Sequence, residues 1–196
     1  MALLLLGILL FLGAHLARVI KPDLRETVIA RYGKAAWGAG HGILSLVGLV
    51  LLCLGFVQAR DAGGAILYTP PAFFSHITLL LMVFASVCLA AGFFPAGRIK
   101  VALKFPFLVA VKIWALSHLL ANGESYSVVL FVAFLAWAVI VRISAKKRLQ
   151  RGEATLPVFV SAKYDVYAIV LGLVFYGLMV WRLHEWLIGV SPLTMG

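Results

Sequence analysis

Charged side chains are scarce in this sequence. Lysine, arginine, aspartate and glutamate together make up 12% of its 196 residues, whereas hydrophobic residues make up 64%. Soluble domains carry about 25% charged and roughly 45–50% apolar residues, so a chain of this size has too much apolar surface to bury within itself. The composition excludes an ordinary soluble domain and predicts that lipid forms part of the solvent.

Acidic residues and cysteines are also few. The chain has seven Asp and Glu residues, and no two of them fall within one apolar run, which disfavours carboxylate acid–base catalysis and a carboxylate-driven proton pump. The two cysteines, Cys53 and Cys88, lie in different runs at different depths, so we expect neither a disulfide nor a Cys-x-x-Cys metal site. The phosphate-binding, nucleophile-elbow and zinc-protease motifs are missing as well.

Most of the sequence consists of apolar runs of about 20 residues, the length of a membrane-spanning helix. Because no water reaches the membrane core, backbone polar groups must bond within each segment, and runs of this length favour helices over barrel strands. The sequence therefore predicts an all-α, polytopic membrane helical bundle with about six spans, forming one domain over residues 1–196. The expected spans are Ala2–Ile20, Trp37–Val57, Phe73–Phe94, Val101–Ala121, Tyr126–Ser144 and Val166–Ile188.

The cations are gathered in alternate connections. The first, third and fifth connections are rich in Lys and Arg, whereas the second has only Arg60 and the fourth has none. Because cation-rich short loops stay in the cytoplasm, we expect both termini on the opposite side of the membrane. Membrane topology and contact with the lipid bilayer, including anionic lipid, thus account for the net charge of +10, and no nucleic-acid partner is expected.

The five histidines sort by depth. At a rise of about 1.5 Å per residue, His15 and His41 fall toward the cytoplasmic ends of their spans. His76, His118 and His184 fall toward the outer ends of three different spans. Imidazoles that converge from several helices are what a metal or haem site needs. The alternative interpretation is that each imidazole is an interfacial or interhelical hydrogen-bonding group.

Two ionisable residues, Lys112 and His118, lie inside the fourth apolar run, and Trp114 precedes His118 by one turn on the same helical face. Ionisable groups at membrane depth are costly and usually face a bundle interior or a cavity. Three roles are open to Lys112: its ammonium can snorkel to the surface, pair with an acidic group, or bind an anion such as a haem propionate.

Small residues recur along the second expected span. Gly42, Ser45 and Gly48 follow one another at spacings of three. Small residues at such spacings allow helices to approach closely in a membrane. This stripe therefore predicts a helix-packing face.

The central pattern of the chain is Gly97-Arg98-Ile99-Lys100-x-Ala-Leu-Lys104-x-Pro106, followed by Lys112-x-Trp114-Ala-Leu-x-His118-Leu-Leu-Ala-Asn122-Gly123. The chain opens with Phe-Leu-Gly-Ala-His15-Leu-x-Arg18 and closes with Leu-His184-x-Trp-Leu-Ile-Gly189-Val. These patterns closely resemble the NnrU family of bacterial membrane proteins over nearly the whole chain. The resemblance implies an integral protein of the bacterial inner membrane that is linked to nitrite and nitric oxide respiration, and the charge pattern then predicts periplasmic termini.

The NnrU family is related to the 15-cis-zeta-carotene isomerases, integral membrane enzymes that hold b-type haem through histidines. The resemblance implies that His15 and His118 match the positions that ligate the haem iron. Two positions differ from the pattern: Ala115 stands where the isomerase has Cys, and Phe105 stands where the family commonly has His. The candidate cofactor-binding residues are His15, His118, Lys112, Trp114, His76 and His184.

A second arrangement of the histidines follows from depth. His15 and His118 come out about 15 Å apart along the membrane normal, from the helical rise. Two axial ligands of one iron need similar depths, so His118 would pair better with His76 or His184. His15 would then lie near His41 and Phe105.

Three functions remain as hypotheses. The first is a haem-associated membrane protein that supports nitrite and nitric oxide metabolism through sensing, maturation or electron transfer. The second is a cis–trans isomerase that acts on a carotenoid or a similar lipophilic small molecule. The third is a non-catalytic membrane scaffold or assembly factor, in which the histidines are structural.

Overall fold

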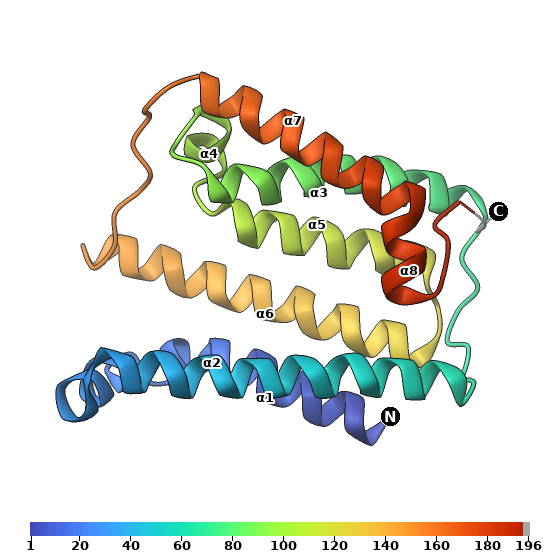
Figure 1. The fold of residues 1–196 in the computed structure, drawn as a ribbon, viewed down its shortest axis with the longest axis horizontal. Coiled ribbons are helices and arrows are strands. Elements are labelled where there is room, and N and C mark those ends of the chain that lie inside the picture. The colour runs from blue at the N-terminus through green and yellow to red at the C-terminus, as the bar shows by residue number, and fades with distance from the viewer. Residues whose placement is uncertain (194–196) are drawn as a thin grey trace. The chain divides into compact units, whose positions relative to one another are not determined.

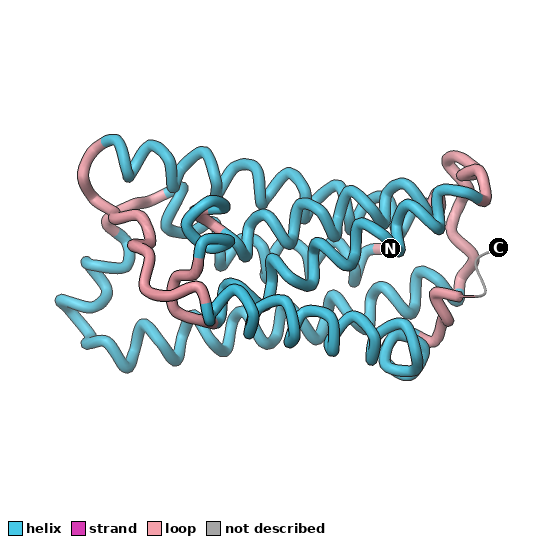
Figure 2. The backbone as a smooth tube through the Cα atoms, turned by 90° about the horizontal axis from the view of Figure 1, so that it is seen from above, coloured by secondary structure: helices cyan, strands magenta, loops and turns pink. Residues whose placement is uncertain are grey.

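The computed structural model describes residues 1–193 of the chain. Within this range the elements are helices joined by loops, with no strand, as Figure 2 shows, and one isolated bridge pairs Ile66 with Glu124. The prediction of an all-α fold is confirmed. The elements are α1 (Ala2–Ile20), α2 (Leu24–Asp61), α3 (Phe73–Phe93), α4 (Arg98–Leu103), α5 (Pro106–Ala121), α6 (Ser125–Gln150), α7 (Lys163–Leu178), the π-helix η1 (Met179–Leu183) and α8 (His184–Ile188).

The chain forms two compact units. Residues 1–67 and 124–137 make the first, and residues 68–123 with the chain from residue 138 onward make the second. Helix α6 contributes its beginning to the first unit and its end to the second. The interpretation of residues 1–196 as one domain stays a prediction.

Glycines bring α1 and α2 together, side by side and antiparallel, in the first unit (Figure 1). A Cβ atom on Gly48 would lie 2.5 Å from the backbone nitrogen of Phe11, and one on Gly7 or Gly55 would collide with the opposite backbone. Such close approach is how helices associate in lipid, where packing replaces the hydrophobic driving force. The pairs that meet are Gly7 with Leu52, Gly48 with Phe11 and Gly55 with Leu4.

The predicted packing face on α2 is therefore only partly right. Gly48 packs as expected, but a Cβ on Gly42 would meet nothing within 4 Å. The residues that face α1 follow spacings of three and four from Gly48 to Gly55, as the 3.6-residue period requires.

The second unit is built on α3, which packs against both α5 and α7. Its small core contains Ala90, Ala91 and Ala168. A Cβ on Gly172 of α7 would lie 2.7 Å from the Cα atom of Val87, so these helices also approach closely. Small side chains thus set the spacing of the helices in this unit as they do in the first.

The fourth expected span, Val101–Ala121, is wrong as one continuous helix. Its chain breaks after α4, where Lys104 adopts φ 64° and ψ −47° and the Phe105 amide donates to the Leu103 carbonyl at 2.7 Å. Helix α5 then begins at Pro106, whose missing amide hydrogen and fixed φ suit a first helical position. Apolar residues stand on both sides of this turn, so the apolar pattern alone did not locate it.

Other boundaries differ because polar residues extend the helices. Helix α2 begins at Leu24 rather than Trp37 and continues across a break at Gly33, where φ is 85°. Helix α6 runs on to Gln150 rather than ending at Ser144. The sixth expected span contains the π-helical turn η1 between α7 and α8. Backbone hydrogen bonds continue past the apolar segment, so hydropathy underestimates helix length.

Among residues 1–193, five helical segments are long and apolar enough to cross a membrane. Helix α5, with 16 residues, is shorter than these; its length is about 24 Å at 1.5 Å per residue, against a hydrocarbon core of about 30 Å. Large apolar side chains are exposed along the long helices, including Leu9 at 68%, Ile43 at 65% and Leu80 at 60%. Surfaces of this kind suit lipid, and the chain is a multi-pass membrane protein.

Candidate functional site

Three imidazoles share one hydrogen-bonding arrangement. The Nδ1 atoms of His15, His118 and His184 each lie within hydrogen-bonding distance of a backbone carbonyl oxygen. Because a carbonyl only accepts, Nδ1 must carry the proton, and the neutral ring keeps its lone pair on Nε2. Metal-ligating histidines are oriented in this way. The acceptors are Phe11 at 2.7 Å from His15, Trp114 at 2.9 Å from His118 and Val190 at 2.7 Å from His184.

His118 lies in the second unit on α5, half-buried, with its backbone acceptor one turn earlier on the same helix. The Trp114 ring packs beside it with ring centroids 5.6 Å apart, as the helical spacing predicts. His184 lies near enough to act electrostatically on the His118 ring. The structure therefore brings His118, Trp114 and His184 together within one unit.

His76 has a different environment in the same unit. Its side chain is exposed on α3. Phe73 and Leu80, at helical spacings of three and four from it, are 58% and 60% exposed. This face of α3 turns outward in the second unit, so the structure does not bring His76 into the group around His118. Its role as a cofactor ligand stays a prediction.

His15 lies in the first unit within a group of aromatic rings. Its ring centroid is 5.2 Å from that of His41 and 6.1 Å from that of Trp137. Trp37 stacks on His41 with an interplanar angle of 11°. The prediction that His15 and His41 are neighbours is confirmed. His15 and His118 belong to different units, and Phe105 also belongs to the second.

Two buried polar atoms near His15 have no hydrogen-bond partner among residues 1–193: Ser45 Oγ and Trp137 Nε1. The antiparallel register, with Gly48 against Phe11, places Ser45 opposite the turn that contains His15. Sequence reasoning missed both residues as site candidates. Ser45 follows His41 by four positions and so shares its face, which was a usable signal. Trp137 lies on a helix distant in the sequence, so no spacing in the sequence indicated that it is a neighbour of His15.

Lys112 is half-buried on α5, and the charges of Arg142 and Lys146 on α6 act on its ammonium group. The two α6 residues are four positions apart and share a helix face. In the part of the chain that the structure describes, none of these cations forms an ion pair. Sequence reasoning identified Lys112 but missed its two neighbours. Such a group of cations attracts an anionic ligand.

Ala115 occupies the position where the isomerases have Cys. Its side chain is 0% exposed, packed inside the second unit. A methyl group offers neither a metal ligand nor a proton, so this position cannot provide the chemistry of a thiol. Isomerase activity therefore stays a prediction that rests on the resemblance.

The fold and these groups define a class: multi-pass helical membrane proteins that carry imidazoles and a lysine on their apolar helices. Residues 3–192 match the family model described as NnrU protein. The chain belongs to the NnrU family. Comparison with curated proteins and comparison with solved structures each returned no match.

Proposed function

We propose that this NnrU-family protein associates with b-type haem in the membrane and supports nitrite and nitric oxide metabolism. The observation that carries the proposal is the Nδ1 contact with a backbone carbonyl oxygen that His15, His118 and His184 share. Each ring has Nδ1 held by a backbone carbonyl, which orients the imidazole as in metal-ligating histidines, where Nε2 is the ligand atom. A neutral imidazole is a common axial ligand of haem iron. Bound haem would supply redox or gas-binding chemistry.

The residues present fit the rest of the cofactor as well. A b-type haem has an apolar ring and two carboxylates. Trp114 offers an aromatic surface beside His118, and Lys112 with Arg142 and Lys146 offers unpaired positive charge for the carboxylates. By resemblance His15 and His118 are the ligand positions, and His184 is the alternative partner of His118 in its own unit.

Replacing His118 by alanine should remove most of the haem from the purified protein. The side chain that offers Nε2 is lost, and alanine cannot replace it. The measurement is the Soret absorbance per mole of protein, after expression in haem-replete cells. His76→Ala is the matched control, because His76 is exposed on α3, and it should leave the Soret band unchanged. The proposal is wrong if the wild-type protein is colourless.

The link to nitrogen oxides is tested in a denitrifying bacterium that lacks its own NnrU protein. The wild-type chain should restore nitric oxide and nitrite consumption, and His118→Ala should not. If replacement of His15 and His118 changes neither the spectrum nor this phenotype, the protein is a scaffold in which these histidines are structural. If cells that accumulate poly-cis zeta-carotene change their pigment profile on expression, the isomerase hypothesis gains its support.

The cation distribution leads us to propose that the protein lies in the bacterial inner membrane with both termini in the periplasm. Alkaline phosphatase fused after Leu193 should then be active, because that enzyme folds only outside the cytoplasm. The same enzyme inserted at Gly152, an exposed turn position with φ 74°, should be inactive. The reverse pair of activities would contradict the proposed orientation.

A further inference from the structure

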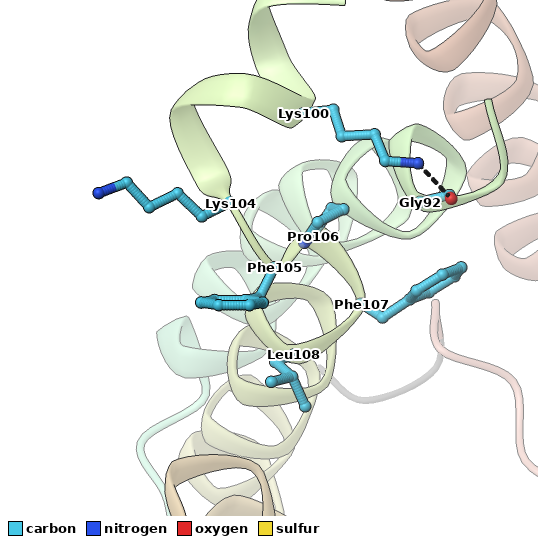
Figure 3. Close-up of a pocket in the computed structure, with 7 residues that line it drawn as sticks. All are labelled: Gly92, Lys100, Lys104, Phe105, Pro106, Phe107 and Leu108. Atoms are coloured by element: carbon cyan, nitrogen blue, oxygen red, sulfur yellow. Dashed lines mark hydrogen bonds between the residues drawn. The ribbon is translucent and has the colours of Figure 1, made fainter. Parts of the chain in front are cut away.

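Two hollows border α4 and the turn that follows it in the second unit. The first has a volume of about 380 Å³ and is lined by Arg98, Val101, Ala102 and Phe159. The second, drawn in Figure 3, has a volume of about 240 Å³. Its lining residues are Gly92, Lys100, Lys104, Phe105, Pro106, Phe107 and Leu108. Each hollow therefore combines positive charge with an apolar and aromatic wall.

The wall that carries Arg98 is fixed by hydrogen bonds. The backbone amides of Arg98 and Ile99 donate to the two carboxylate oxygens of Asp165, each at 2.9 Å. The Val160 amide donates to the Ala96 carbonyl at 2.7 Å and ties the loop that contains Phe159 to the start of α4. The Arg98 guanidinium itself forms no ion pair within residues 1–193. The structure thus fixes the backbone from which this cation extends.

The two lysines of the second hollow differ. The Lys100 ammonium donates to the carbonyls of Gly92 at 2.9 Å and Phe94 at 2.7 Å, so it completes the end of α3. Lys104 points away from Lys100, as Figure 3 shows, and it has no ion-pair partner in the described chain. Lys104 is therefore the free cation of this hollow.

The backbone at Lys104 is strained. Its φ of 64° is the only positive value at a non-glycine residue in the part of the chain that the structure describes. With the hydrogen bond from the Phe105 amide to the Leu103 carbonyl, it forms a γ-turn of the unfavourable hand. Glycine would relieve this strain at once, yet the position holds a lysine. Strained backbone of this kind clusters at ligand-binding and active sites.

Exposed apolar side chains adjoin these cations. Phe159 is 49% exposed, its neighbours Val158 and Val160 are 81% and 60% exposed, and Phe107 is 42% exposed. In water this surface would be costly, and a free inorganic anion would leave it uncovered. A ligand that satisfies both parts of the surface has an anionic group joined to a hydrocarbon chain.

We propose that α4 and the turn after it form a docking site for an anionic phospholipid. Arg98 at the first hollow and Lys104 at the second supply the positive charge for the anionic headgroup, and acyl chains cover the aromatic walls at Phe159 and Phe105. The charge complementarity and the membrane setting argue for this occupant. The site uses none of the histidines of the haem proposal and does not depend on it.

The test uses the full-length protein in neutral detergent. Added phosphatidylglycerol should raise the melting temperature of the wild-type protein, whereas phosphatidylcholine and glycerol phosphate should not. The double variant Arg98→Gln/Lys104→Gln should bind phosphatidylglycerol about 30-fold more weakly. Each cation near a membrane surface contributes about 1 kcal/mol, and a change of about 1.4 kcal/mol corresponds to a tenfold change in affinity. Lipid retained in native mass spectrometry gives a second readout.

The matched control is Lys21→Gln/Lys34→Gln, which removes two exposed cations from another cation-rich connection. It should keep wild-type binding of phosphatidylglycerol. Equal losses in both double variants would show diffuse electrostatic attraction and overturn the docking site. Glycerol phosphate that protects as well as the whole lipid would equally overturn it, because the apolar walls would then have no part.

Single variants at Lys104 separate charge from backbone strain. Lys104→Gln keeps the strained turn and loses the charge, so it should bind phosphatidylglycerol more weakly without a change in the melting temperature of the lipid-free protein. Lys104→Gly should also bind more weakly, but with a higher lipid-free melting temperature, because glycine accepts this φ. Wild-type lipid binding in Lys104→Gln would contradict the proposal.

Discussion

Replacing Gly48 and Gly55 together by alanine is expected to prevent the close packing of α1 on α2. The added methyl groups would meet the backbone of α1, at 2.5 Å from the Phe11 nitrogen for Gly48 and closer still at Leu4 for Gly55. Backbone atoms cannot move aside as flexible side chains do, so the helices must separate. Overpacking typically costs about 1–3 kcal/mol per site, and the separation also loses the contacts along the rest of the helix pair. The measurement is the thermal unfolding midpoint in detergent, followed by size-exclusion chromatography.

The control for this variant lies on the same two helices. Alanine at Gly13 of α1 and at Gly40 of α2 would meet nothing within 4 Å. Alanine favours helix over glycine by roughly 1 kcal/mol, so Gly13→Ala/Gly40→Ala should be as stable as the wild type or more stable. Equal loss of stability in the two double variants would show that the glycines matter for flexibility, not for close contact, and would contradict the packing explanation.

Replacing Asp165 by alanine is expected to destabilise the second unit around α4. The carboxylate accepts hydrogen bonds from two backbone amides, those of Arg98 and Ile99. Without it, both donors at the start of α4 lose their acceptor, at about 1–3 kcal/mol for each group that stays buried and unpaired. Gly97 is adapted to this contact, because a Cβ there would collide with the Asp165 carboxylate. Hydrogen exchange at the amides of residues 98 and 99 should accelerate in the variant, together with a lower unfolding midpoint.

Two further variants sharpen that result. Asp165→Asn keeps one carbonyl acceptor and should retain part of the stability. Asp23→Ala removes the same charge at a residue whose side chain makes no capping hydrogen bond to α2, and it should behave like the wild type. If Asp165→Ala exchanged no faster than the wild type at residues 98 and 99, the capping role of Asp165 would be wrong.

The candidate site shows how far local sequence patterns reach. Trp114 and His118 were expected on one face because they are four residues apart on one helix, and their rings do pack together. His15 and His41 were expected at one depth because charge patterning sets the direction of each span, and their rings are neighbours. Trp137, Arg142 and Lys146 come from a helix distant in sequence, so no spacing within one segment could place them beside His15 or Lys112.

The sequence by itself determined the lipid environment and the class of fold. Hydrophobic residues make up 64% of the chain and stand in long runs, and in lipid such runs satisfy their backbone hydrogen bonds as helices. It also determined which ionisable groups lie within the apolar helical segments, because these groups stand inside the apolar runs. Only the tertiary structure decided where the fourth span breaks at Lys104 and that Asp165 holds the start of α4. These features depend on backbone dihedral angles and on contacts between residues far apart in the chain, and the pattern of hydropathy contains neither.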